Sequence, residues 1–347
     1  MLIFGLAVEF WARVDDYVAY AAPMWSSYNN RGLYTTDSLG QRGKPNASYR
    51  KWQLNELGFR GPAFKLGRVN IVSFGASETF GLYESDGKEY PRQLEEMLNR
   101  RLGNETVQVV NAAYPGESAL TANVRAPEIV EQIHPTLAIV YPTPADYIWL
   151  PYLSPSKSGP QPKEKFEWRV AERVRTLIKG VLPQAIQTRL REMEIERSAA
   201  EFKVMDTLPE ENVQRFHDDV TRLVLTLRSR GVRPVIVTHA SALAPTSTAD
   251  DRQLLVSWRK FYPMLKEAGF LDMEQRMNEA LRAIATEQNM TLIDAARAIP
   301  PNHVNFADFV HFTDQGATMM ASTLADGLLP ILRERIANRS RQESDAK

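Results

Sequence analysis

The chain has 347 residues, of which 44% are apolar, and it carries 42 basic and 42 acidic side chains and no cysteine. This length accommodates one large domain or two modest ones with a sizeable core. The formal net charge of zero provides no global attraction to nucleic acid or to an anionic membrane, so we expect neither as an electrostatic partner. The absence of cysteine excludes disulfides, thiolate metal sites and a cysteine nucleophile.

Residues 1 to 14 are mostly apolar. The run before Glu9 is too short to span a bilayer, which takes roughly 20 residues, and it lacks the basic region and cleavage site of a signal peptide. Two interpretations stay open. The run is the end of a membrane anchor that begins before this chain, or it is an amphipathic helix packed on the domain. The first interpretation, with the absent cysteines, favours an exported protein, periplasmic or extracellular, held at a membrane.

Residues 15 to 68 are rich in Tyr, Asn, Gly and Arg, which predicts irregular structure with short strands. We therefore treat residues 1–68 as an N-terminal segment that packs on a main domain. The glycines of residues 55–61 predict a tight turn that presents Arg60. This arginine either contacts a substrate anion or the rim of an active site, or it anchors its own loop.

From residue 69 the pattern alternates between strands and helices. Short apolar runs predict five strands, at residues 69–74, 107–112, 137–141, 233–238 and 291–294, and helical segments include residues 90–98, 210–230 and 273–289. Such alternation predicts an α/β fold with a parallel sheet covered on both faces.

A long stretch interrupts this alternation. Residues 151–232 begin with a Pro- and Ser-rich run and continue as charged helical segments, which we interpret as a helical insertion beside the active face. The main domain then covers residues 69–335, and residues 336–347 form a polar tail.

Three side chains suggest nucleophilic chemistry. Ser77 follows a strand that ends in Gly75, at the edge where open α/β sheets bind ligands. Asp308 and His311 lie three residues apart, in a loop before a helix expected near Thr313. Serine hydrolysis needs a hydroxyl that attacks, an imidazole that takes its proton and a carboxylate that orients the imidazole. The alternative is that Ser77 is only a turn residue beside a helix.

Three stretches of the chain resemble motif blocks of the SGNH (GDSL-type) hydrolase family. Residues 75–81 are similar to the first block, Gly-Asp-Ser-x-Thr-x-Gly, with Ala76 in place of the aspartate. Residues 111–116 are similar to the second block, which ends in a glycine, and residues 308–311 are similar to the last block. The resemblance covers roughly residues 50–330.

What the resemblance implies is a flavodoxin-like three-layer α/β/α sandwich, with a mostly parallel five-stranded sheet, that cleaves esters. It assigns the nucleophile role to Ser77, the base role to His311 and the orienting role to Asp308. It assigns the oxyanion hole to the backbone amides of Ser77 and Gly116. The substrates it suggests are small-molecule or saccharide esters, often acetyl esters of carbohydrates, or lipid esters.

One departure from the family pattern concerns the oxyanion hole. The third block of the family, Gly-x-Asn-Asp, supplies an asparagine side chain, and the aligned residues 143–146 place Ala145 at that position. Losing one such donor typically costs about 100- to 1000-fold in rate. Thr143, Asn111 and Asn123 are candidates to replace it. Otherwise the enzyme is slow or the site has another use.

Other motifs point away from cofactors. No pair of histidines or cysteines has zinc-ligand spacing and no phosphate-binding loop is present, so we expect neither metal nor cofactor. His239, at the end of the fourth expected strand, either lines the pocket or is a hydrogen-bonded turn histidine. Two alternatives to hydrolysis remain: an O-acyltransferase acting on a polysaccharide, and a catalytically degenerate relative that binds saccharide or protein.

Overall fold

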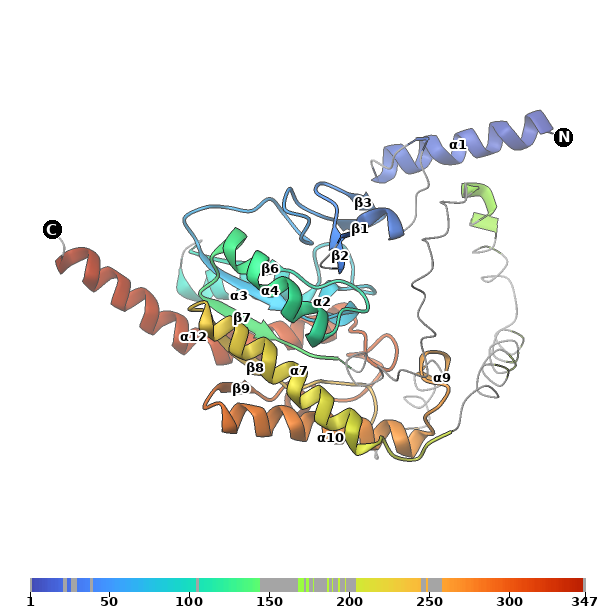
Figure 1. Cartoon of the computed structure of the whole chain (residues 1–347). Coiled ribbons are helices and arrows are strands. Elements are labelled where there is room, and N and C mark those ends of the chain that lie inside the picture. Colours follow the sequence, from blue (N-terminus) through green and yellow to red (C-terminus); the bar gives the residue numbers. More distant parts are fainter. Residues whose placement is uncertain are drawn as a thin grey trace. The chain divides into compact units, whose positions relative to one another are not determined.

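The computed structural model describes residues 2–20, 24–25, 30–37, 40–103, 106–143, 168–171, 173–174, 177, 186, 189, 193, 197, 204–244, 248 and 258–345. These residues belong to two compact units, each described here by itself (Figure 1). The first unit comprises Met1–Phe64, Leu150–Val204 and Arg259–Met264. The second comprises Lys65–Trp149, Met205–Trp258 and Leu265–Lys347.

The second unit is built on a five-stranded sheet whose strands all run parallel. Its strands are β5 (Val69–Phe74), β6 (Val107–Asn111), β7 (Leu137–Val140), β8 (Arg233–Val237) and β9 (Thr291–Ile293). Their order is β6-β5-β7-β8-β9, which is the flavodoxin-like order second, first, third, fourth, fifth. The expected fold is therefore confirmed, and the sheet is wholly rather than mostly parallel.

Helices cover both faces of this sheet, which makes the unit a three-layer α/β/α sandwich (Figure 1). One layer contains α3 (Tyr90–Leu102) and α12 (Asp314–Asp345), and the other contains α4 (Ala119–Ile133), α7 (Glu210–Ser229) and α10 (Glu267–Glu287). The strands read as continuous apolar runs because both of their faces are buried.

The core follows the alternation of side chains along each strand. Ile71, Ile139 and Val235 pack with the α3–α12 layer in one apolar cluster. Val72 and Ile236, one residue along, are equally inaccessible to solvent and point to the opposite layer. Both faces thus supply a close-packed support for the loops at the carboxyl edge of the sheet.

Helix boundaries agree with the expected segments in most places. The helix expected over residues 210–230 is α7, and α12 begins one residue after Thr313. The prediction for residues 273–289 was too short at its start, because α10 begins at Glu267. Within residues 151–232, α7 packs beside α4 as a layer helix, and much of the remaining stretch lies outside the described residues.

Short helices are α2 (Ser77–Phe80), α9 (Trp258–Phe261) and α11 (Ala295–Ala298).

The first unit contains α1 (Leu2–Tyr20), a 3-10 helix η1 (Asn30–Leu33) and two short hairpins. The hairpins pair β1 (Tyr34–Asp37) with β2 (Gly40–Gly43), and β3 (Ser48–Tyr49) with β4 (Trp52–Gln53). Short strands were expected here, but the helix runs on to Tyr20, into the stretch predicted as irregular.

The continuation of α1 has a physical reason in the ion pairs of its second half. Asp16 accepts a hydrogen bond of 3.0 Å from Arg169 and one of 2.7 Å from Arg173. Two turns earlier, Glu9 pairs with Arg13 at 2.9 Å and accepts from the backbone amide of Arg169 at 3.0 Å. Charged side chains are thus buried on one face of α1.

Large apolar side chains lie on the exposed face of the same helix. Phe4, Trp11 and Val18 expose 73%, 71% and 78% of their surface. Among the helices that the structure describes, none has the length and apolar character needed to cross a membrane.

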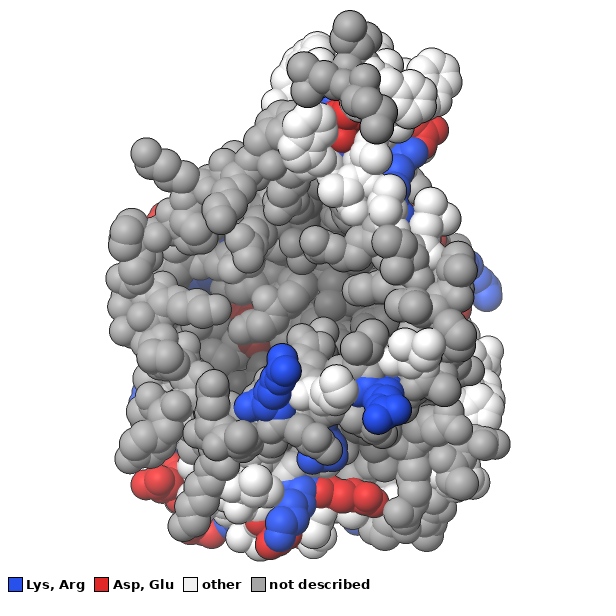
Figure 2. Space-filling model, turned by 90° about the vertical axis from the view of Figure 1, so that its right-hand side faces the viewer, with Lys and Arg blue, Asp and Glu red and all other residues white. Residues whose placement is uncertain are grey.

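Charged side chains of both signs lie close to one another among the described residues on the face drawn in Figure 2. This intermixing agrees with the formal net charge of zero.

Candidate active site

The turn after β5 carries the candidate nucleophile. Gly75 follows the strand, and a Cβ atom there would lie 2.1 Å from Thr79 Oγ1 and 3.1 Å from the Tyr141 carbonyl oxygen. Glycine is therefore required for the close approach of this turn to α2 and to the end of β7. Ser77 is the first residue of α2 and is half-buried. It lies at the carboxyl end of β5, where the sequence predicts it.

The loop before α12 brings Asp308 and His311 together. His311 Nδ1 lies 2.7 Å from Asp308 Oδ2, and Asp308 Oδ1 accepts from the backbone amides of Val310 and His311. Burial opposes the charge of Asp308, but the hydrogen bonds from His311 and from these amides hold the pKa of its carboxyl below the ordinary value. The carboxylate is thus ionised and fixes the orientation of the imidazole.

The other ring nitrogen of His311 is buried and has no hydrogen-bond partner within the described part of the chain. Burial alone would lower the pKa of His311, but the hydrogen bond to Asp308 and the charges of Glu78, Asp308 and Glu84 raise it above its ordinary value. Nε2 is therefore the position where a proton could be accepted.

Contacts join the segment after Ser77 to the loop of His311. The Tyr83 and His311 rings have their centroids 4.9 Å apart. The backbone amide of Ser85 donates to Asp314 Oδ1 at 2.6 Å. These contacts hold the two chemistry-bearing loops side by side at the carboxyl edge of the sheet.

The Ser77 hydroxyl has an acceptor that the sequence does not predict. Ser77 Oγ donates to Glu78 Oε2 at 2.9 Å. Burial raises the pKa of Glu78, but its interactions with His239 and His311 outweigh this effect and lower it. The sequence feature that could have revealed this contact is the acidic residue directly after Ser77, in a turn between apolar residues.

His239 lies two residues after the end of β8. Its side chain is buried, with Nδ1 2.8 Å from Glu274 Oε2 and Nε2 3.7 Å from Glu78 Oε1. Burial lowers the pKa of His239, but the carboxylates of Glu274 and Glu78 raise it to about 9. His239 is thus an imidazolium between two carboxylates, and the sequence gives no sign of Glu274 as its partner.

Gly116, a candidate oxyanion donor, lies in a turn with a defined backbone conformation. Gly116 has φ 81° in the turn that leads into α4, a backbone conformation that favours glycine. Ser118 caps α4 in a reciprocal capping box with Thr121, which fixes the end of that turn. The amide of Gly116 therefore belongs to a well-defined turn after β6.

The side chains considered as replacements for the missing asparagine have other surroundings. Asn111 Nδ2 donates to the Thr79 carbonyl at 2.8 Å, so this amide braces α2. Asn123 lies in α4, and its buried Oδ1 accepts no hydrogen bond from the described residues. Thr143 is buried just after β7, and Ala145 lies outside the described residues.

Arg60 belongs to the first unit. Asn55 Oδ1 accepts from the amides of Leu57 and Phe59, which makes the tight turn expected there, and Arg60 is buried and bridges to Leu54.

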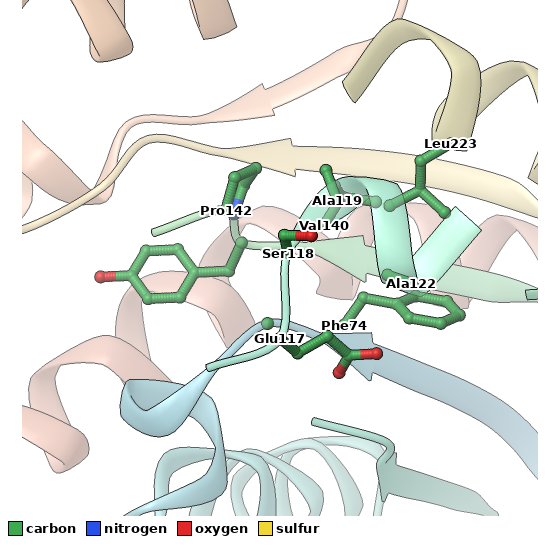
Figure 3. Close-up of a pocket in the computed structure, with 10 residues that line it drawn as sticks. Phe74, Glu117, Ser118, Ala119, Ala122, Val140, Pro142 and Leu223 are labelled. Atoms are coloured by element: carbon green, nitrogen blue, oxygen red, sulfur yellow. The ribbon is translucent and has the colours of Figure 1, made fainter. Parts of the chain in front are cut away.

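A small, mainly apolar pocket lies at the carboxyl ends of β5 and β7, where the strand order reverses (Figure 3). This switch point is where doubly wound sheets bind ligands. Phe74, Ala122 and Leu223 gather at one end of the pocket and Pro142 lies at the other. Gly75, two residues before Ser77, also lines it, whereas the three proposed triad residues do not.

No family model matches the chain, and the search of curated proteins found no match. Solved structures do resemble it. A putative lipolytic protein of the G-D-S-L family from Desulfitobacterium hafniense has 13% identity and a TM-score of 0.44, covering 75% of this chain and 100% of that one. A lipase/acylhydrolase from Enterococcus faecalis has 13% identity and a TM-score of 0.45, covering 75% and 95%. An acetyl xylan esterase has 13% identity and a TM-score of 0.44, covering 74% and 98%.

Proposed function

We propose that this chain is a serine ester hydrolase of the SGNH type, with Ser77, His311 and Asp308 as its triad. The observation that carries the proposal is the Asp308–His311 pair. Its buried Nε2 has no partner in the described structure, and its loop contacts the segment that follows Ser77. The flavodoxin-like strand order and the motif resemblance support it.

The reaction begins with Ser77 Oγ attacking the acyl carbonyl carbon. The proton leaves Oγ for His311 Nε2 while the Oγ–carbon bond forms, and Asp308 stabilises the resulting imidazolium. The amides of Ser77 and Gly116 donate to the carbonyl oxygen as it becomes negative. His311 then gives its proton to the oxygen of the leaving alcohol, and the acyl group stays on Ser77. A water molecule attacks this acyl group while His311 takes its proton, and the acid is released from Ser77.

We infer that the acyl group is short, and that the alcohol is a saccharide or similar hydroxyl compound. The pocket at the switch point supports a short acyl chain, because it is small, mainly apolar and lined by Gly75, two residues before Ser77. The saccharide is suggested by the motif resemblance. Acetyl esters of carbohydrates satisfy both conditions.

The test is turnover of an activated acetyl ester and of a panel of acetylated saccharides by the purified chain. We expect Ser77→Ala to abolish turnover and Ser229→Ala, an exposed serine at the end of α7, to leave it unchanged. Turnover that survives Ser77→Ala contradicts the assignment. Saccharide binding without turnover in the unmodified chain indicates a degenerate relative, and acylated acceptor glycan in place of free acid indicates a transferase.

We also propose that α1 associates with the surface of a lipid bilayer, in an exported protein. The support is its arrangement of side chains, with Glu9 and Asp16 buried in ion pairs and Phe4, Trp11 and Val18 exposed. Aromatic and aliphatic side chains of this kind insert at the boundary between headgroups and acyl chains.

A further inference from the structure

A buried cluster of two acidic side chains and a histidine, made of Glu78, His239 and Glu274, lies beside the candidate nucleophile. Ser77 Oγ donates to Glu78 Oε2 at 2.9 Å, and the second carboxylate oxygen of Glu78 lies 3.7 Å from His239 Nε2. His239 Nδ1 lies 2.8 Å from Glu274 Oε2. Glu78, His239 and Glu274 expose only 2%, 1% and 6% of their surface, so water does not screen their interactions.

Three separate elements hold this buried cluster in place, because Glu78 lies in α2, His239 follows β8 and Glu274 lies in α10. Asn278 fixes the backbone of His239 on both sides, accepting from its amide at 2.7 Å and donating to its carbonyl at 2.9 Å. The Tyr141 ring stacks on the imidazole with centroids 5.5 Å apart. Burying three ionisable groups costs free energy that their pairing only partly offsets, which indicates a use beyond stability.

Glu78 is the member of this buried cluster that contacts the nucleophile. Glu274 and Glu78 together hold His239 as an imidazolium, with a pKa of about 9. The lowered pKa of Glu78 makes its carboxylate an acceptor for the Ser77 hydroxyl and a weak base. Glu78 therefore holds the proton of Ser77 in a hydrogen bond without removing it.

We propose that Glu78 is a positioning residue of this site: it holds the Ser77 hydroxyl in the resting enzyme, and its negative charge stabilises the imidazolium that forms on His311. The inference rests on the proposed esterase function. When ester binds, the hydroxyl turns from Glu78 to His311 Nε2, which is otherwise unoccupied in the described structure. The O–H bond then breaks towards Nε2 as the Oγ–carbon bond forms.

Several groups face His311 and set its charge. Asp308 comes from its own loop, Glu78 from α2 and Glu84 from the segment after α2, and the Tyr83 ring lies against the imidazole. All three carboxylates favour the imidazolium. Removing the charge of Glu78 therefore lowers the pKa of His311 while the other two carboxylates remain.

The test is Glu78→Gln in the full chain, which keeps the shape of the side chain and removes its charge. We expect kcat on an activated acetyl ester to fall by on the order of 10²-fold, with little change in KM, because the imidazolium that forms on His311 loses a stabilising negative charge. The acid limb of the kcat/KM profile moves to lower pH. Glu78→Asp keeps the charge and returns the acid limb towards its original position. Unchanged kcat and an unchanged acid limb in Glu78→Gln overturn the proposal.

A matched control separates this effect from general destabilisation. Glu95 is another largely buried carboxylate, in α3, where it accepts from the Val109 amide at 2.9 Å. We expect Glu95→Gln to leave the acid limb and kcat unchanged in folded protein. The same losses in Glu95→Gln as in Glu78→Gln overturn the proposal.

A second readout needs no turnover. Nitrogen-15 NMR of the imidazoles at about pH 7.5 reports the charge of each histidine, and His239→Gln assigns the relevant signal. We expect an imidazolium at His239 that titrates at lower pH in Glu78→Gln. A His311 imidazole that titrates at the same pH in Glu78→Gln as in the unmodified active enzyme overturns this inference alone. A charged His239 in a folded protein without esterase activity overturns the proposed function and, with it, the positioning role.

Discussion

At the scale of single residues, the short contact between Asp308 and His311 determines how the imidazole is presented. Asp308 accepts from His311 Nδ1 and from two backbone amides, so the imidazole is held with Nε2 directed away from the carboxylate. An amide in place of the carboxylate removes the charge that stabilises the imidazolium and permits the wrong tautomer.

Asp308→Asn is therefore expected to lower kcat on an activated acetyl ester by about 10⁴-fold with little change in fold. Steady-state kinetics and circular dichroism measure the two quantities. A loss smaller than about tenfold in folded protein would show that Asp308 does not orient the base.

His239 also makes the stability of the protein depend on pH. Its pKa rises from 6.5 in the unfolded chain to about 9 in the folded protein. The resulting stabilisation is fully present below about pH 6.5 and is lost as pH rises through about 9. A shift of this size corresponds to on the order of 3 kcal/mol.

The difference in unfolding free energy between the unmodified chain and His239→Gln is expected to shrink between pH 7 and pH 10. Urea denaturation at both values measures it. Because groups that do not contact His239 cancel between the two proteins, a difference that stays constant or grows with pH contradicts the charged state of His239.

At the scale of elements, the loop of His311 depends on its contact with α12. Gly316 lies in the first turn of this helix, and a Cβ atom there would lie 1.9 Å from the backbone carbonyl oxygen of Asn305. The Thr313 amide donates to the same carbonyl at 3.0 Å, so the loop and the helix start are packed as one piece.

Gly316→Ala is expected to displace this loop, with a loss of roughly 1–3 kcal/mol in unfolding free energy and a fall in esterase activity. Ala317→Gly, which creates no clash one position along, is the control for activity. Thermal unfolding and turnover measure the effects, and a Gly316→Ala protein with unchanged stability and activity would show that the close approach has no role.

The strands and the site loops were largely predictable from the sequence. Buried parallel strands read as continuous apolar runs, so each of the five was predicted to within about one residue of its observed ends. Ser77 was placed correctly at a strand end for the same reason. The start of α10 was missed because Lys266 gives no side-chain cap to mark it.

The buried cluster of Glu78, His239 and Glu274 was not predictable from the sequence. His239 and Glu274 are separated by 35 residues, and only the packing of α10 against the end of β8 brings them together. No local pattern marks Glu274 on a helix that has other acidic side chains on its surface. Such pairs follow from tertiary structure and are outside the reach of periodicity or motifs.

At the scale of the whole molecule, α1 presents an apolar surface. Phe10 and Trp11 expose 49% and 71% of their surface, and charge is buried beneath. Exposed aromatic side chains of this kind can insert at the boundary between the headgroups and acyl chains of a bilayer. The proposed binding to a bilayer would depend on apolar area, because the net charge of the chain is zero.

We expect the full chain to float with neutral phosphatidylcholine vesicles, and the double variant Phe10→Ser and Trp11→Ser to lose most of this binding. Leu225→Ser, which changes an exposed leucine on α7, is the matched control and should bind as before. Equal flotation of all three proteins, or of none, contradicts the proposed role of α1.

The most direct measurement of the central claim is labelling with a fluorophosphonate probe, followed by mass spectrometry of the modified peptide. We expect stoichiometric phosphonylation of Ser77, lost in His311→Ala, because only an activated serine beside a working base reacts with such a probe. No label at Ser77 in folded protein, or equal labelling after His311→Ala, would contradict the assembled triad on which the proposed esterase activity depends.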